Sequence, residues 1–226
     1  MNDSNALDSF LGKWRTRWPE WRVVEAFVPA QQRQLAVAWF TLLQEFSDAT
    51  NVAGDPLPAD AKLAWWGEEL RDWSRRRSRH PLGRLLEPHP APWFELAEAL
   101  PVLVRLRGEL PSVELALDAS RPLVDAVGRV ESNLFQHPSS DALLQALSVQ
   151  LLAERVNGGG AESSRTQWPE LVLARWPSQT GAALPRRLWS AVARARLQQS
   201  IGTARDASPL APARALWTGW RAARQR

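Results

Sequence analysis

Apolar side chains recur every three or four positions along much of the chain, a spacing that places them on one face of an α-helix. The clearest helix is expected at about 29–48, because Pro29 suits a first turn and an apolar stripe follows it. That stripe consists of Leu35, Trp39, Leu42 and Phe46. The pattern therefore predicts a long amphipathic helix in the first quarter of the sequence.

A second helix is expected at about 60–76. Its apolar stripe consists of Leu63, Trp66, Leu70 and Trp73. Glu68 and Glu69 lie off this stripe. We therefore expect both carboxylates to face solvent and to pair with Arg71 or Arg75.

Prolines and glycines separate further helical segments along the rest of the chain, as residues that end or interrupt helices do. The expected helices are 80–87, 92–107 with a kink at Pro101, 119–136, 139–156, 183–202 and 211–224. The β-branched alternation that is typical of strands is scarce. The sequence therefore predicts an all-α fold, with residues 1–226 forming a single-domain helical bundle of roughly eight to ten helices.

Composition narrows the class of protein. The chain has 226 residues, of which 45% are hydrophobic and 23% charged, which is typical of a soluble globular protein. No apolar run approaches the roughly 20 residues that a membrane-spanning helix needs. The first ten residues are polar and acidic, unlike a secretory signal. We therefore expect a cytoplasmic location, with contact at the periphery of a membrane as an additional option.

Two residue types limit the possible chemistry. Cysteine is absent, which excludes disulfides, thiol nucleophiles and zinc–thiolate sites. The three histidines, His80, His89 and His137, share no metal-ligand spacing on one helix, which argues against a zinc site built on histidine. Tyrosine is also absent, so no phenol takes part in any mechanism.

Basic residues are concentrated toward the C-terminal end. Residues 175–226 carry ten arginines and one acid, Asp206, whereas the whole chain has a net charge of only +4. The basic helices expected at about 183–226 suit an anionic membrane surface or a diphosphate, and a solvated helix face is the simpler alternative. Nucleic acid is not expected, because no nucleic-acid motif is present and the tryptophans are not interleaved with these arginines in a stacking pattern.

Several short segments, in this order and spacing, resemble the squalene/phytoene synthase family. The segments are Phe27-Val28-Pro29-Ala30, Trp39-Phe40, Asp48, Lys62-Leu63-Ala64-Trp65-Trp66-Gly67-Glu68-Glu69-Leu70 and His80-Pro81-Leu82. The nine-residue run 62–70 is the most specific of them, and the resemblance covers about residues 10–160. It implies the all-α isoprenoid synthase fold and a place in isoprenoid metabolism.

The resemblance also implies a reaction. The family condenses two prenyl diphosphates head to head, and two Asp-rich motifs on facing helices hold the Mg²⁺ ions that bind the diphosphate. The chemistry is reasonable, because diphosphate leaves only once its charge is neutralised and Mg²⁺ prefers carboxylate oxygens. The residues expected to line the prenyl cavity are Phe40, Leu43, Trp65 and Trp66.

The first metal motif departs from the family pattern. Where Asp-Asp-x-x-Asp is usual, this chain has Ser47-Asp48-Ala49-Thr50-Asn51. Asp48 is the only carboxylate left there, and it points about 100° around the helix from Ser47. Asp48 is therefore the single candidate metal ligand of this motif.

The second motif departs in the same way. Gln150-Leu151-Leu152-Ala153 resembles the helix that precedes it, but neutral residues stand where acids are expected: Asn157, Gly160 and Ala161. Neutral oxygens can contact Mg²⁺ without balancing its charge against a diphosphate. We therefore expect no cofactor, with Mg²⁺ required only if the chain is active, and the sequence assigns no catalytic residue.

Three functional hypotheses remain open. The first is a catalytically impaired relative that binds a prenyl diphosphate or another isoprenoid lipid, or that stabilises a protein partner. The second is an active prenyl transferase with atypical ligands, for which the available carboxylates are Glu45, Asp48, Glu68, Glu69 and Glu154. The third is an all-α interaction protein whose basic tail binds an anionic partner.

Overall fold

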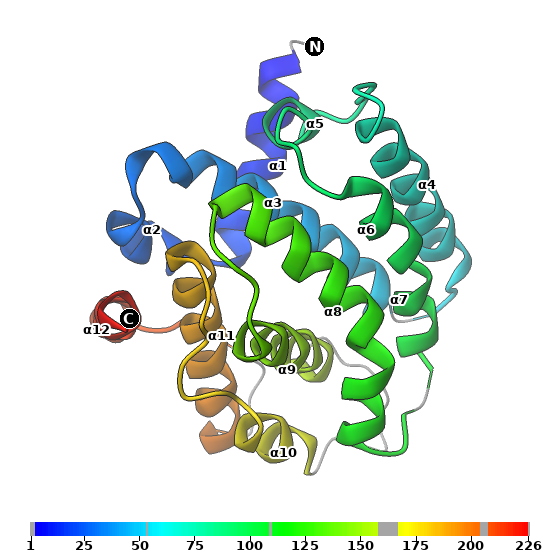
Figure 1. Cartoon of the computed structure of the whole chain (residues 1–226). Helices are drawn as coiled ribbons and strands as arrows, with labels where there is room; N and C mark the ends of the chain where they lie inside the picture. The colour runs from blue at the N-terminus through cyan, green and yellow to red at the C-terminus, as the bar shows by residue number, and fades with distance from the viewer. Residues whose placement is uncertain (1–2, 53, 109, 158–166, 204–207, 226) are drawn as a thin grey trace.

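The computed structural model describes residues 3–52, 54–108, 110–157, 167–203 and 208–225, and all regular structure within these ranges is helical (Figure 1). The elements are α1 (Asp3–Arg17), α2 (Trp21–Val24), the 3₁₀-helix η1 (Glu25–Phe27), α3 (Ala30–Thr50), α4 (Leu57–Trp73), α5 (Gly83–Leu86), α6 (Trp93–Ala99), α7 (Pro101–Leu106), α8 (Val113–Phe135), α9 (Asp141–Asn157), α10 (Trp168–Ala174), α11 (Leu184–Thr203) and α12 (Pro212–Arg224). The prediction of an all-α fold is confirmed.

The long helix α3 lies in the middle of the fold and contacts α1, α4, α5, α7, α9 and α11. Its central residues are buried on every side: Ala36, Val37, Ala38, Trp39, Phe40, Thr41 and Leu42. A helix that is surrounded by others in this way belongs to the interior of the bundle. The amphipathic stripe expected at 29–48 is therefore only part of the surface that α3 buries.

Local sequence explains several helix boundaries. The expected helix at 92–107 is divided into α6 and α7 at Pro101, which takes the first position of α7 because that position needs no amide hydrogen bond. Helix α8 begins at Val113, six residues before the expected start at 119, because the side chain of Ser112 caps it by accepting a hydrogen bond from the Leu115 amide. The segment 80–87 is helical only over Gly83–Leu86.

Two buried ion pairs attach α11 to the rest of the bundle. Arg186 pairs with Glu131 of α8, and Arg196 pairs with Glu20, which lies between α1 and α2. Glu20 also accepts a hydrogen bond from the Leu210 amide at 2.6 Å, so the same carboxylate holds the segment before α12. Two arginines of the basic C-terminal region are thus interior residues.

The expectation for Glu69 is wrong. Its side chain is completely buried and accepts hydrogen bonds from the Trp73 indole and from the amides of Arg79 and His80. The segment after α4 folds back over the helix, so that the amides of Arg79 and His80 point at the carboxylate. Helical periodicity alone does not reveal this arrangement. Glu68 does face solvent and pairs with Arg71 at 2.8 Å, as expected.

No helix in the described ranges combines the length and the apolar character needed to cross a bilayer.

Candidate functional site

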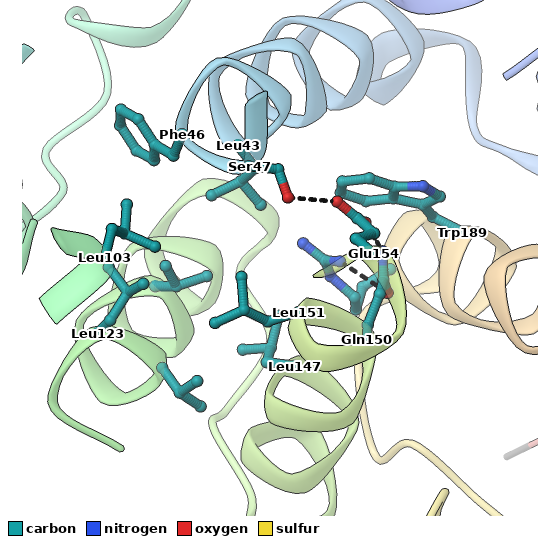
Figure 2. Close-up of a pocket in the computed structure, with 13 residues that line it drawn as sticks. Leu43, Phe46, Ser47, Leu103, Leu123, Leu147, Gln150, Leu151, Glu154 and Trp189 are labelled. Atoms are coloured by element: carbon teal, nitrogen blue, oxygen red, sulfur yellow. Dashed lines mark hydrogen bonds between the residues drawn. The ribbon is translucent and has the colours of Figure 1, made fainter. Parts of the chain in front are cut away.

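The two segments that resemble metal motifs meet between α3 and α9 (Figure 2). Ser47 of α3 donates a hydrogen bond to Glu154 Oε2 of α9 at 2.6 Å, and Gln150 donates to Glu154 Oε1 at 3.1 Å. Asn51, one turn beyond Ser47, donates from its side chain to the carbonyl oxygen of Glu154 at 3.4 Å. Neutral residues from both segments therefore converge on one carboxyl group.

An apolar cavity adjoins this cluster and is bounded by α3, α7, α8, α9 and α11. It offers about 60 Å³ to the centres of water molecules. Its lining residues are Leu43, Phe46, Ser47, Leu103, Leu123, Val124, Val127, Leu147, Gln150, Leu151, Glu154, Arg186 and Trp189. Figure 2 shows the polar side chains gathered near Trp189, with Leu103 and Leu123 on the opposite side. The cavity thus has one polar end and an otherwise apolar wall.

The positive charge at the polar end is already balanced. Arg186 is only 1% exposed, and its Nε lies 2.9 and 3.1 Å from the two carboxylate oxygens of Glu131. The indole of Trp39 donates a further hydrogen bond to Glu131 at 2.7 Å. The Arg186 guanidinium also lies over the ring of Trp189 at 4.6 Å and donates to Gln150 Oε1 at 3.2 Å. This arginine is a fixed part of the cavity wall rather than a free cation.

Glu154, by contrast, has no basic partner at ion-pair distance among the described residues. Burial raises the pKa of Glu154 above its ordinary value, and the hydrogen bonds from Ser47 and Gln150 offset only part of that effect. A carboxyl group with a raised pKa spends more time protonated, and then it donates a hydrogen bond as well as accepting one.

Asp48 lies outside this site. Its carboxylate accepts a hydrogen bond from Gln44 at 2.9 Å and lies 3.8 Å from the Arg17 guanidinium of α1. It lines a separate hollow against α1, as expected for a residue about 100° around the helix from Ser47. The structure thus separates Asp48 from Ser47 and Asn51.

Of the four residues expected to line a prenyl cavity, the structure places Leu43 in the lining. Phe40 is buried one turn earlier, among Trp14, Trp21 and Trp189. Trp66 is buried against Phe46 and His80, and Trp65 is 41% exposed on the outer side of α4. Trp65 and Trp66 both lie on α4, whose inner face packs on α3 and α6, and neither residue borders this cavity.

The remaining members of the second motif do not add to the site. Asn157 is the last residue of α9 and is absent from the cavity lining. Gly160 and Ala161 lie outside the described residues.

The five carboxylates that an active enzyme would draw on are dispersed. Glu45 pairs with Lys62 at 2.6 Å and with Lys13 at 3.3 Å. Burial alone would raise the pKa of Glu45, but these two lysines hold it below its ordinary value. Glu45 and Asp48 line the hollow against α1, Glu154 lines the apolar cavity, and Glu68 and Glu69 lie on α4. Within the described ranges, no group of three or more acidic or histidine side chains is arranged to hold a metal ion.

Sequence reasoning did not identify Arg186, Glu131 or Trp189 as parts of the site. Glu154 was considered only as an alternative carboxylate, although its position four residues after Gln150 places both on one face of α9. That spacing is the signal that could have assigned Glu154 to the site.

In comparisons with known proteins, no family model, curated protein or solved structure matches this chain.

Proposed function

We propose that the chain binds an isoprenoid lipid in the cavity between α3, α8 and α9, as a divergent, non-condensing relative of the squalene/phytoene synthases with an isoprenoid synthase type of bundle. The observation that carries the proposal is the convergence of Ser47, Gln150 and Glu154 at one end of an apolar cavity. The family resemblance implies two motifs on facing helices. In support of this, α3 and α9, which carry the corresponding segments, contact each other.

The wall of the cavity suits a branched hydrocarbon chain. Leucine, valine and phenylalanine side chains from four helices, α3, α7, α8 and α9, make up most of the lining. Each methylene group that leaves water contributes about 0.8 kcal/mol to binding. The space holds roughly four waters, so a chain of farnesyl length requires leucine side chains of the lining to change rotamer.

The polar end suits a neutral oxygen better than a diphosphate. Arg186 is balanced by Glu131, and the site adds a carboxyl group instead of a cation. A diphosphate placed there would be buried without a counter-charge, which costs several kcal/mol. A hydroxyl or carbonyl group can instead exchange hydrogen bonds with Ser47, Gln150 and the Glu154 carboxyl group. The proposed ligand is therefore a prenyl chain that carries a neutral head group.

A cavity-filling variant tests the binding site. Val127→Phe places a larger ring in the lining, and Val104→Phe makes the same change at an exposed position of α7. We expect calorimetric titration with farnesol to show binding by the unmodified chain and by Val104→Phe. Binding by Val127→Phe should be at least about tenfold weaker, since the ring occupies space that the ligand needs. Circular dichroism checks that both variants are folded.

An activity assay tests the absence of condensation. We expect no release of diphosphate from farnesyl diphosphate, with or without Mg²⁺. Metal-dependent release together with a hydrocarbon product would contradict the proposal and establish the active prenyl transferase instead.

A further inference from the structure

The C-terminal helix α12 has a narrow inner face that packs on the bundle. Ala215, Gly219 and Ala222 are buried on that face, and α12 contacts α2 and α11. A Cβ atom at Gly219 would lie 2.7 Å from Val24 Cγ1, so the absence of a side chain there lets α12 approach α2 closely. The small inner residues determine which side of α12 faces outward.

The outward side of α12 exposes large apolar side chains. Trp217 is 57% exposed, Leu216 50% and Trp220 38%. The two indole rings stack with their centroids 4.9 Å apart, and the Arg224 guanidinium lies 4.7 Å from the centre of a Trp220 ring. This cluster, the α12 aromatic face, is a contiguous apolar patch of the kind that marks a binding surface.

The surroundings of the α12 aromatic face are basic. Helix α12 carries Arg214, Arg221 and Arg224 and no acidic residue. A groove of about 260 Å³ runs between α11 and α12; it is lined in part by Trp217 and by three arginines, Arg187, Arg194 and Arg221, and none of its lining residues is acidic.

The arginines of the groove retain unused hydrogen-bonding capacity. The Nε atoms of Arg187 and Arg194 are buried and have no hydrogen-bond partner. These two atoms are enclosed by the protein, and Arg187 Nη1 donates to the Gln225 carbonyl oxygen. The three positive charges, with no acidic residue in the lining, nevertheless suit the oxygens of a phosphate group.

We propose that the α12 aromatic face and the adjacent arginine groove dock the protein on a bilayer that contains anionic phospholipids. Tryptophan prefers the boundary between lipid head groups and acyl chains, where its ring is apolar and its N–H finds a partner. A helix with Trp and Leu on one side and arginines beside them has the composition of an interfacial helix. The groove receives the phosphate of a lipid head group. This proposal does not depend on the cavity or its ligand.

Vesicle flotation tests the proposal with the full chain. We expect the protein to float with vesicles of phosphatidylcholine mixed with phosphatidylglycerol and to remain unbound with phosphatidylcholine alone. The double variant Trp217→Ser, Trp220→Ser should bind at least about tenfold more weakly, because it removes the apolar contact. The matched control is Trp65→Ser, which removes an indole of similar exposure on α4 and should leave flotation unchanged.

A second pair of variants tests the charge. Each arginine near an anionic surface strengthens binding roughly fivefold, so Arg214→Gln, Arg221→Gln and Arg224→Gln together should weaken it roughly 100-fold. The control removes three exposed arginines from α7 and α8, with the substitutions Arg105→Gln, Arg121→Gln and Arg129→Gln. Both triple variants have the same net charge, so a difference between them reports position.

Three results would overturn the proposal. The first is an absence of flotation, or equal flotation with both vesicle types. The second is equal weakening by each variant and its control. The third is full displacement from vesicles by soluble glycerol phosphate at matched ionic strength, which would make the groove a site for small anions. Circular dichroism first checks that the α12 variants keep the native spectrum. If they do not, the single variant Trp217→Ser, at the most exposed position, provides the test.

Discussion

The buried ion pair between Arg186 and Glu131 forms part of the cavity wall, and its contribution to the free energy of unfolding can be measured by substitution. The substitution Arg186→Met keeps a long apolar side chain but removes the charge. Glu131, whose side chain is 3% exposed, would then keep only the hydrogen bond from Trp39. Breaking a buried pair by removing one partner costs about 3–5 kcal/mol, because a buried charge is left without compensation.

The matched variant removes both charges. Glu131→Gln combined with Arg186→Met leaves a neutral side chain of the same shape, which still accepts the Trp39 hydrogen bond. Replacing a buried pair by neutral groups is often close to neutral in stability. We therefore expect the double variant to recover about 2–3 kcal/mol of what the single variant loses.

Urea unfolding followed by circular dichroism measures these differences. The single variant should shift the midpoint strongly, since about 4 kcal/mol is a large part of the 5–15 kcal/mol that usually stabilises a domain. Two results would refute the reasoning: a cost below about 1 kcal/mol for Arg186→Met, or a double variant no more stable than the single one.

Two further predictions concern α4 and the segment that follows it. Burial lowers the pKa of His80 from 6.5 to about 4, so the unfolded chain binds the extra proton and stability is lost as the pH falls from 6.5 toward 4. The free energy of unfolding, measured with urea, should be about 1 kcal/mol lower at pH 5 than at pH 7, and His80→Gln should make this difference smaller. An equal difference in the variant would contradict this prediction. Glu69→Gln should cost about 2 kcal/mol, because the amide cannot accept from all the donors that surround the carboxylate, whereas Glu68→Gln on the exposed side should cost less than about 0.5 kcal/mol. Equal midpoints for these two variants would show that the buried hydrogen bonds contribute little.

Periodicity predicted the helices that carry strong apolar stripes. The segments at 29–48 and 139–156 correspond to α3 and α9, and these two helices carry the polar end of the cavity. Helix α1 was not predicted, although Leu7, Leu11 and Trp14 have helical spacing and are buried. The polar composition of the first ten residues concealed that stripe.

Which charged residues pair with each other could not be predicted from the sequence. Arg186 and Arg196 were assigned to a basic surface, but each is buried against a carboxylate that is distant along the chain. Nothing in the local sequence distinguishes them from Arg221, which is exposed. The sequence likewise did not reveal the contacts between arginines and tryptophans within the fold, where Arg224 lies over Trp220 and Arg196 over Trp18.

The degenerate motifs were partly informative. Ser47 was recognised as a replacement for an acidic residue, and Gln150 as part of the helix before the second motif. In the structure both donate hydrogen bonds to Glu154. Asp48 lines a different hollow from Ser47, as its position about 100° around the helix predicts. The apolar wall could not be predicted, because Leu103 and Leu123 reach the cavity through tertiary packing of α7 and α8.

Binding of a neutral prenyl lipid in the cavity is tested most directly by calorimetric titration of the same protein preparation with farnesol and with farnesyl diphosphate, each with and without Mg²⁺. We expect farnesol to bind with an affinity that does not change with Mg²⁺. Farnesyl diphosphate should bind at least about tenfold more weakly, because the polar end of the cavity offers the diphosphate no free cation. Tighter binding of farnesyl diphosphate that depends on Mg²⁺ would contradict the proposed function and show that the site retains the metal-dependent recognition of a prenyl transferase.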